Sequence, residues 1–129
     1  MEIDHLSLNA DGCLLQARQF YTELLQMRLI NDQRPAAFHE IIPGDWFEIG
    51  TTRLHVFDYP VGGRFRQVGQ PQPGGPHVAF RVPDLPLVIA RLEARHIPFQ
   101  TMGEGLKKQI WFLDPAGNTI EINTGNAKN

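Results

Sequence analysis

The sequence predicts an α+β protein built from two βαβββ modules, because the same order of elements occurs twice along its 129 residues. The strand that opens each half has a similar sequence, Asp-His-Leu-Ser-Leu-Asn at 4–9 and Pro-His-Val-Ala-Phe-Arg at 76–81. A helical pattern, a short strand and a pair of strands follow each opening. Four prolines and five glycines over 60–76 separate the halves and exclude a long regular element there.

In the first half, apolar and polar residues alternate over 3–10, which predicts a strand with one apolar and one polar face. Leu14, Ala17, Tyr21 and Leu24 then recur at helical spacing. The elements expected after the first strand are a helix at about 13–27 with Asp11 as its N-cap, a strand at about 28–32, and a hairpin of 46–49 and 54–57 around Gly50.

The second half repeats this order. Its first strand is expected at 76–82, and Leu85, Val88 and Leu92 form the apolar stripe of the helix that follows. The remaining elements expected are a helix at about 85–95 capped by Asp84, a short strand at 97–100, and strands at 108–113 and 118–123 joined by a turn at 114–117. Each helix covers the apolar face of its own sheet.

One domain with four parts is expected from this organisation. They are a first module at 1–59, a glycine- and proline-rich linker or lid at 60–75, a second module at 76–124 and a tail at 125–129. A linker is the ordinary interpretation of such a loop and a lid is the functional one, and the two are compatible.

Composition and charge exclude several classes of function. The net charge is −2 and the isoelectric point is near 6.2, so nothing attracts the chain to nucleic acid or to an anionic membrane. No stretch approaches the ~18 apolar residues that suggest a membrane span. The single cysteine, Cys13, excludes an internal disulfide, as is usual in a reducing compartment. We expect a cytoplasmic protein whose partner is a small molecule.

Side chains that bind metals occupy equivalent positions in the two halves. His5 corresponds to His77, and His55 corresponds to Glu121. Because the helices take the alternate apolar residues, all four side chains lie on the opposite faces of the sheets. One histidine on a strand is more often a hydrogen-bonded surface residue, but the repetition favours a metal site. Two imidazoles and a carboxylate leave coordination positions open and suit one divalent ion per site: Zn, Ni, Mn, Co or Fe(II).

The chain resembles the vicinal oxygen chelate superfamily, which includes glyoxalases, bleomycin resistance proteins and extradiol dioxygenases. The resemblance spans about residues 2–124, and its motifs are Asp4-His5-Leu6, Phe20-Tyr21-x-x-Leu24-Leu25, Leu54-His55-Val56-Phe57, Pro76-His77-Val78-Ala79-Phe80 and Asp114-Pro115-Ala116-Gly117-Asn118-Thr119-Ile120-Glu121. It implies two βαβββ modules forming a U-shaped, partly closed sheet around a metal held by His5, His77 and Glu121. It also implies a homodimer, in which the two chains often complete each site together.

His55 separates the activities that the resemblance implies. Glyoxalase-like members commonly carry a glutamate there as a further ligand and proton carrier, whereas extradiol dioxygenases have an acid–base histidine. An imidazole of ordinary pKa, about 6.5, moves protons at physiological pH. His55 is therefore a candidate proton carrier, fourth ligand or hydrogen-bond donor to substrate, and Glu121 can share the proton transfer. Against a dioxygenase, Trp111 stands where those enzymes have a tyrosine.

These residues predict a metal-dependent, glyoxalase-like isomerase or lyase that acts on a small oxygen-chelating substrate, with His55 and Glu121 as its catalytic residues. The alternatives are an extradiol-type ring-cleaving dioxygenase and, in a different class, a non-catalytic protein that binds or sequesters a small molecule. The candidates to line the substrate pocket are Phe57, Trp111 and Arg64. Packing explains the two aromatic side chains equally well, and a solvated loop charge explains the arginine better. His39 and His96 are expected to lie on the surface.

Overall fold

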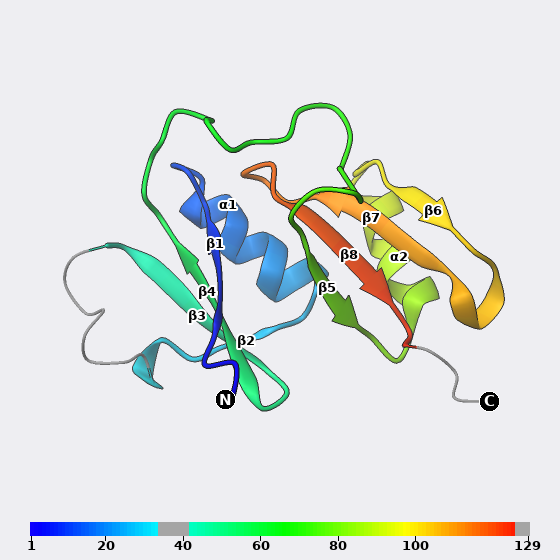
Figure 1. The fold of residues 1–129 in the computed structure, drawn as a ribbon, viewed down its shortest axis with the longest axis horizontal. Coiled ribbons are helices and arrows are strands. Elements are labelled where there is room, and N and C mark those ends of the chain that lie inside the picture. The colour runs from blue at the N-terminus through cyan, green and yellow to red at the C-terminus, as the bar shows by residue number, and fades with distance from the viewer. Residues whose placement is uncertain (34–41, 126–129) are drawn as a thin grey trace. The chain divides into compact units, whose positions relative to one another are not determined.

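The computed structural model describes residues 1–33 and 42–125, and the chain divides into two compact units, Met1–Phe65 and Arg66–Asn129 (Figure 1). Each unit contains one βαβββ module, so the predicted α+β class and its two modules are confirmed. The boundary between the units falls inside the glycine- and proline-rich stretch. His39 and the part of the predicted tail beyond Gly125 lie outside the described residues.

In the first unit, one helical segment packs on a mixed four-stranded sheet. The sheet order is β1-β4-β3-β2, with β1 parallel to β4 and the other pairs antiparallel. Its elements are β1 (Leu6–Asn9), α1 (Leu14–Gln19), the π-helical turn η1 (Phe20–Leu24), β2 (Arg28–Leu29), the 3-10 turn η2 (Asn31–Gln33), β3 (Gly44–Ile49) and β4 (Thr52–Phe57). The ring of Tyr21 lies 5.7 Å from that of Phe47, and both residues are fully buried. The apolar stripe predicted from the sequence therefore faces the core.

The second unit has the same connectivity. Its sheet order is β5-β8-β7-β6, again with the first pair parallel and the others antiparallel. Its elements are β5 (Val78–Arg81), α2 (Leu85–Ala94), β6 (Gln100–Met102), the 3-10 turn η4 (Gly105–Lys107), β7 (Gln109–Leu113) and β8 (Thr119–Asn123). Its core is buried and apolar, with contributions from the helix and from the two central strands: Leu85, Val88, Leu92, Ile110, Phe112, Ile120 and Ile122.

The strand register places the four candidate ligands at matching positions. His55 of β4 pairs with the second residue of β1, and Glu121 of β8 pairs with the second residue of β5. His5 and His77 each lie immediately before the first residue of the strand that opens their module. The register therefore agrees with the correspondence between the halves inferred from the sequence.

The register also shows that the two tryptophans occupy equivalent positions in the two modules. Trp46 of β3 pairs with His55, and Trp111 of β7 pairs with Glu121. Residues directly opposite each other in an antiparallel pair share a face of the sheet. Each half consequently has an indole on the same face as its candidate polar residue.

The predicted N-cap of the first helix is wrong, whereas that of the second is confirmed. Asp84 accepts a hydrogen bond from the Leu87 N–H at 3.0 Å, as an N-cap does. The first helix instead has Cys13 at its N-cap position. Asp11 has a positive φ of 45° and its carboxylate accepts hydrogen bonds from the backbone N–H groups of Val61 and Gly63, both at 2.7 Å. It fixes the start of the long loop rather than the helix.

The long loop over 60–76 contains no helix or strand, as predicted. In the second unit two backbone N–H groups of the loop donate hydrogen bonds: Gln67 N–H to the Gly117 carbonyl at 3.0 Å, and Gln72 N–H to the side-chain oxygen Oγ1 of Thr119 at 3.1 Å. Its function as a linker or lid stays a prediction. No helix among the described residues is long and apolar enough to span a membrane.

Candidate functional site

His5 is oriented by a carboxylate. Its Nδ1 lies 2.6 Å from Asp4 Oδ2, and Arg53 Nη2 lies 3.2 Å from the other Asp4 oxygen. The hydrogen bond from His5 is the largest effect that lowers the pKa of Asp4, with the Arg53 charge adding to it. Because an ionised carboxylate only accepts hydrogen bonds, Nδ1 of His5 carries a proton. A carboxylate on the non-coordinating nitrogen is the usual arrangement of a metal-binding histidine.

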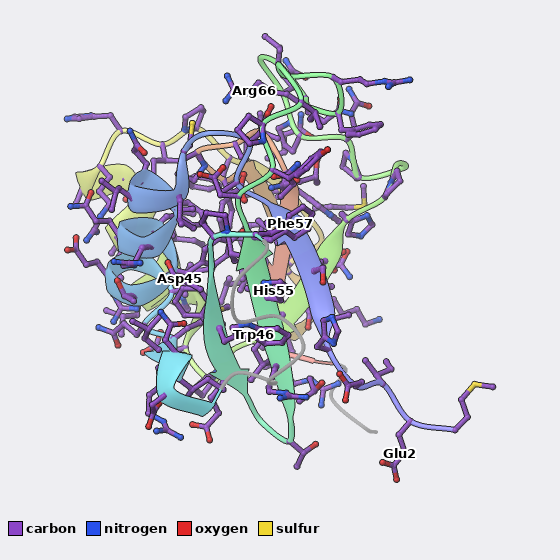
Figure 2. All side chains as sticks on the ribbon, turned by 90° about the vertical axis from the view of Figure 1, so that its left-hand side faces the viewer. Glu2, Asp45, Trp46, His55, Phe57 and Arg66 are labelled. Carbon is purple, nitrogen blue, oxygen red and sulfur yellow. The ribbon has the colours of Figure 1, made fainter. Side chains whose placement is uncertain are left out.

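His55 lies flat against an indole in the same unit. Its ring stacks on Trp46 (Figure 2), with centroids 4.1 Å apart and an interplanar angle of 5°. The His5 ring lies 6.1 Å from the His55 ring. Only 7% of His55 is exposed, and burial lowers its pKa to about 4. The charge of His5 adds to this lowering, while that of Asp45 opposes it. His55 is therefore neutral at physiological pH.

The proposed role of His55 as a proton carrier assumed an ordinary imidazole pKa near 6.5, and the lowered pKa of about 4 corrects that assumption. A neutral imidazole with a pKa of about 4 accepts protons weakly. It remains able to act as a hydrogen-bonding group or a metal ligand. Each of the three predicted roles of His55 stays a prediction.

Gly44 makes room for this imidazole. A Cβ atom added at Gly44 would lie 2.9 Å from the carbonyl oxygen of Val56 and 3.0 Å from His55 Nε2. Both distances are shorter than ordinary van der Waals contact, and one of the atoms belongs to the backbone. Only glycine fits at this end of β3 without displacing either the strand or the ring.

The second unit brings His77 and Glu121 together. His77 Nδ1 lies 2.8 Å from the Gly75 carbonyl oxygen, and Nε2 lies 3.0 Å from Glu121 Oε2. Asn123 Nδ2 donates to the other oxygen of Glu121 at 3.1 Å. Since a carbonyl only accepts, the Gly75 contact assigns a proton to Nδ1. In the neutral ring the lone pair of Nε2 then faces a carboxylate oxygen.

Two lone pairs at 3.0 Å require a positive charge between or beside them. A proton held between the two groups supplies one, and a cation bound by both groups does the same. Glu121 is 8% exposed, so its charge is poorly solvated and gains from either. An imidazole nitrogen and a carboxylate oxygen are ligands that borderline divalent ions prefer. This pair therefore fits the predicted metal.

Each unit thus contributes two of the four predicted ligands. The structure brings His5 near His55 and His77 into contact with Glu121, but within residues 1–33 and 42–125 no group of three such side chains is close enough to hold a metal. The complete ligand set of His5, His77 and Glu121 stays a prediction.

The predicted pocket residues have different surroundings. The Phe57 ring lies 5.7 Å from that of His55 (Figure 2). Trp111 shares the face of Glu121 and is 5% exposed. The guanidinium of Arg64 lies 5.6 Å from the ring of Phe65 in the long loop. His96, at the end of α2, is exposed as predicted.

Sequence reasoning assigned no role in the site to Asp4, Gly75 and Asn123, which contact the candidate ligands. Asp4 was available as a signal, because it is the neighbour of His5 on the chain. Asn123 was also available, since it follows Glu121 at the strand period of two residues. The Gly75 carbonyl gave no signal, because any residue carries one.

The fold and the site define a class: paired βαβββ modules with imidazole and carboxylate groups at equivalent positions on the sheets. Residues 2–122 match the model of the glyoxalase, bleomycin resistance protein and dioxygenase superfamily. The chain belongs to this superfamily.

Solved structures support the fold. A protein from Bacillus anthracis assigned to the glyoxalase family is 25% identical, with a TM-score of 0.71 over 95% of this chain and 93% of that one. A lactoylglutathione lyase from Agrobacterium tumefaciens is 22% identical, with a TM-score of 0.62 over 94% and 91%. A variant of the fosfomycin resistance protein FosX from Listeria monocytogenes, complexed with Mn(II) and 1S,2S-dihydroxypropylphosphonic acid, is 14% identical, with a TM-score of 0.69 over 97% and 93%. No curated protein sequence matches this chain.

Proposed function

We propose that this chain is a divalent-metal-dependent enzyme of the glyoxalase-like isomerase or lyase type, acting on a small substrate that chelates the metal through neighbouring oxygens. His5, His77 and Glu121 are its metal ligands. The observation that carries the proposal is the contact of His77 Nε2 with Glu121 Oε2 at 3.0 Å while Nδ1 is directed to a backbone carbonyl. Superfamily membership and the Mn(II) bound by the FosX relative support it.

The chain's own residues prepare the ligands. Asp4 holds His5 by its Nδ1, and the Gly75 carbonyl holds His77 in the same way, so both rings present Nε2. Asn123 restricts the orientation of the Glu121 carboxylate by donating a hydrogen bond to one of its oxygens. A bound divalent ion supplies Lewis acidity, which stabilises negative charge that develops on a coordinated oxygen. Ordering of the ligands before binding reduces the entropy cost of assembling the site.

His55 and Glu121 are the proposed catalytic residues. His55 is a weak proton acceptor, because its pKa is lowered to about 4 and its ring is confined against Trp46. His55 then acts through its position, as a hydrogen-bonding group or a fourth ligand. Phe57, beside His55, and Trp111, beside Glu121, are proposed to line the substrate pocket. A homodimer, with sites completed by both chains, belongs to the same proposal.

Two further candidates remain. An extradiol-type dioxygenase is favoured by a histidine at position 55 and opposed by Trp111, which replaces the expected tyrosine. A binding or sequestering protein without turnover is favoured by the name of the superfamily, which includes bleomycin resistance proteins. Metal dependence separates that second class from the enzymes, and activity toward hemithioacetals or catechols separates the two enzymes.

The test is metal content, measured by elemental analysis on protein purified without chelator. We expect about one divalent ion per chain in the wild type and loss of the ion in His5→Ala, His77→Ala and Glu121→Gln. His96→Asn is the matched control, because His96 is exposed and its positive φ of 55° suits asparagine. A wild type that binds a small molecule with no metal present would overturn the proposal in favour of sequestration.

The reaction is tested separately. Zinc- or nickel-loaded protein is assayed with a hemithioacetal. Iron(II)-loaded protein is prepared anaerobically and is then assayed with a panel of catechols. Turnover of the hemithioacetal that is lost in Glu121→Gln is the expected result. Ring cleavage of a catechol would replace the first assignment by the second.

A further inference from the structure

We propose that the indole N–H of Trp111 donates a hydrogen bond to a negatively charged oxygen of the substrate, so that the site selects ligands presenting such an acceptor beside their metal-chelating oxygens. The inference rests on the proposed function, because it assigns substrate chemistry to the same site.

Trp111 carries a buried donor whose acceptor is not part of the described chain. Trp111 is 5% exposed, and its Nε1 has no hydrogen-bond partner among residues 1–33 and 42–125. Buried N–H groups in native proteins almost always have an acceptor. The indole nitrogen has no lone pair to accept with, so it is satisfied only by an acceptor atom from outside the described residues.

The strand register places Trp111 on the same face of the sheet as Glu121. Trp111 pairs with Glu121 across β7 and β8, and the Cβ atoms of such a pair are about 4.5–5.5 Å apart on one face of the sheet. Its chain neighbours Ile110 and Phe112 are fully buried and lie on the other face. A small ligand that reaches Glu121 and His77 is therefore within reach of the indole.

The carboxylate next to Trp111 does not serve as its acceptor. The two oxygens of Glu121 are engaged by His77 Nε2 at 3.0 Å and by Asn123 Nδ2 at 3.1 Å. The equivalent indole in the first unit is used differently, because Trp46 stacks on His55 at 4.1 Å. The two halves thus place the same side chain at the same register, and the second leaves its N–H for a ligand.

The donor defines a class of substrate. An indole N–H donates a hydrogen bond but does not release its proton at physiological pH, so it stabilises a charged oxygen without protonating it. Carboxylate, phosphonate and enolate oxygens fit this chemistry. The negative charge of Glu121 repels such an oxygen unless a cation is bound, so binding of an anionic ligand at Trp111 depends on the metal.

Oxalate is a suitable probe, because it offers neighbouring oxygens and only acceptors. Calorimetry measures zinc binding and then oxalate binding to the zinc-loaded protein. A hydrogen bond to a charged acceptor corresponds to about tenfold or more in affinity. We expect Trp111→Phe to weaken oxalate binding by about this factor and to leave the zinc affinity unchanged. Trp46→Phe provides the same ring change at the equivalent position.

The wild type alone supplies a second readout. The chain has two tryptophans, so its ¹H–¹⁵N spectrum contains two indole signals, and either phenylalanine variant assigns them. Oxalate added to zinc-loaded protein should shift the Trp111 signal downfield and should have no such effect without zinc.

The outcomes separate the inference from the proposed function. If zinc does not bind, the proposed function fails and the inference fails with it. If zinc and oxalate bind while the Trp111 signal stays in place and Trp111→Phe retains full oxalate affinity, the inference alone is overturned. An insoluble Trp111→Phe protein leaves the decision to the wild-type spectrum, with assignment from Trp46→Phe.

Discussion

Acid should destabilise the protein through His55 before its carboxylates begin to protonate. The pKa of His55 is lowered from 6.5 to about 4 in the folded state, chiefly by burial. Between these two values the unfolded chain takes up a proton that the folded chain refuses. The free energy of unfolding therefore falls as the pH falls through this window, and the neutral, fully stable form is the one present above it.

The magnitude follows from the same two values. A lowering from 6.5 to about 4 corresponds to roughly 3 kcal/mol in total. About 2 kcal/mol of this is lost by about pH 5, where His55 is still mostly neutral in the folded protein. The loss is large against the roughly 5–15 kcal/mol that stabilises an ordinary domain.

Urea titrations at about pH 7, 6 and 5 would measure the effect. Trp46 reports on the first unit alone in a Trp111→Phe background, since the chain has two tryptophans. A chelator removes metal-linked stabilisation. The titrations are repeated with His55→Gln, which cannot protonate in this range, and with His96→Asn as the control for an exposed imidazole.

The expected result is a difference that depends on pH. The wild type and His96→Asn should lose about 2 kcal/mol more than His55→Gln between about pH 7 and pH 5. Parallel losses in all three proteins would mean that His55 retains its ordinary pKa. The argument that burial and the neighbouring His5 charge keep the ring neutral would then be wrong.

Three other predictions concern the packing and the site. Arg18→Met should cost about 3 kcal/mol or more of unfolding free energy, because it leaves the fully buried Asp45 without its two guanidinium hydrogen bonds. Asp45→Asn should cost about 2 kcal/mol, because the half-exposed arginine returns to water. Equal losses in urea titrations would contradict this order. Gly44→Ala should cost about 2 kcal/mol and alter Trp46 fluorescence by displacing His55, and unchanged stability and spectrum would show that the strand absorbs the extra atom. Zinc at about 100 times its Kd should stabilise the wild type by about 2.7 kcal/mol in thermal melts and leave Glu121→Gln unaffected; an equal shift in both would remove Glu121 from the ligand set.

Much of the fold was predictable because alternation of apolar residues fixes both the strand and its face. His55 lies between two buried apolar neighbours, Leu54 and Val56, and Glu121 lies between Ile120 and Ile122. That pattern leaves one face for the polar residue in each strand. The correspondence between the halves was visible in the sequence for this reason.

The ends of the elements were harder to predict, because long-range hydrogen bonds decide them. Asp11 and Asp84 give the same N-cap signal, but Gly12, with a φ of 85°, adds a turn after Asp11 and the loop N–H groups take its carboxylate. The strand expected at 97–100 begins at Gln100, because the N–H of Ile97 donates to Leu92 at the end of α2. The first helix changes to π-helical hydrogen bonding at Phe20.

The site was predictable as a set of side chains but not as a set of protonation states. The sequence shows that His5 and His77 are equivalent, yet the proton on each Nδ1 follows from different groups, the Asp4 carboxylate and the Gly75 carbonyl. The lowered pKa of His55 depends on a stacked indole from the neighbouring strand. Such properties arise only when the strands are paired.

The protonation states set the charge of the proposed site. Neutral His5 and His77 with ionised Glu121 would leave a bound divalent ion with a net charge near +1, and neutral His55 would not change it. A carboxylate at position 55 would cancel that charge and favour a neutral ligand. The excess positive charge favours an anionic ligand by electrostatic attraction. The indole donor proposed for Trp111, which has no hydrogen-bond partner in the described part of the chain, would stabilise the same kind of oxygen, so the proposed metal ligands and this N–H would favour one substrate chemistry.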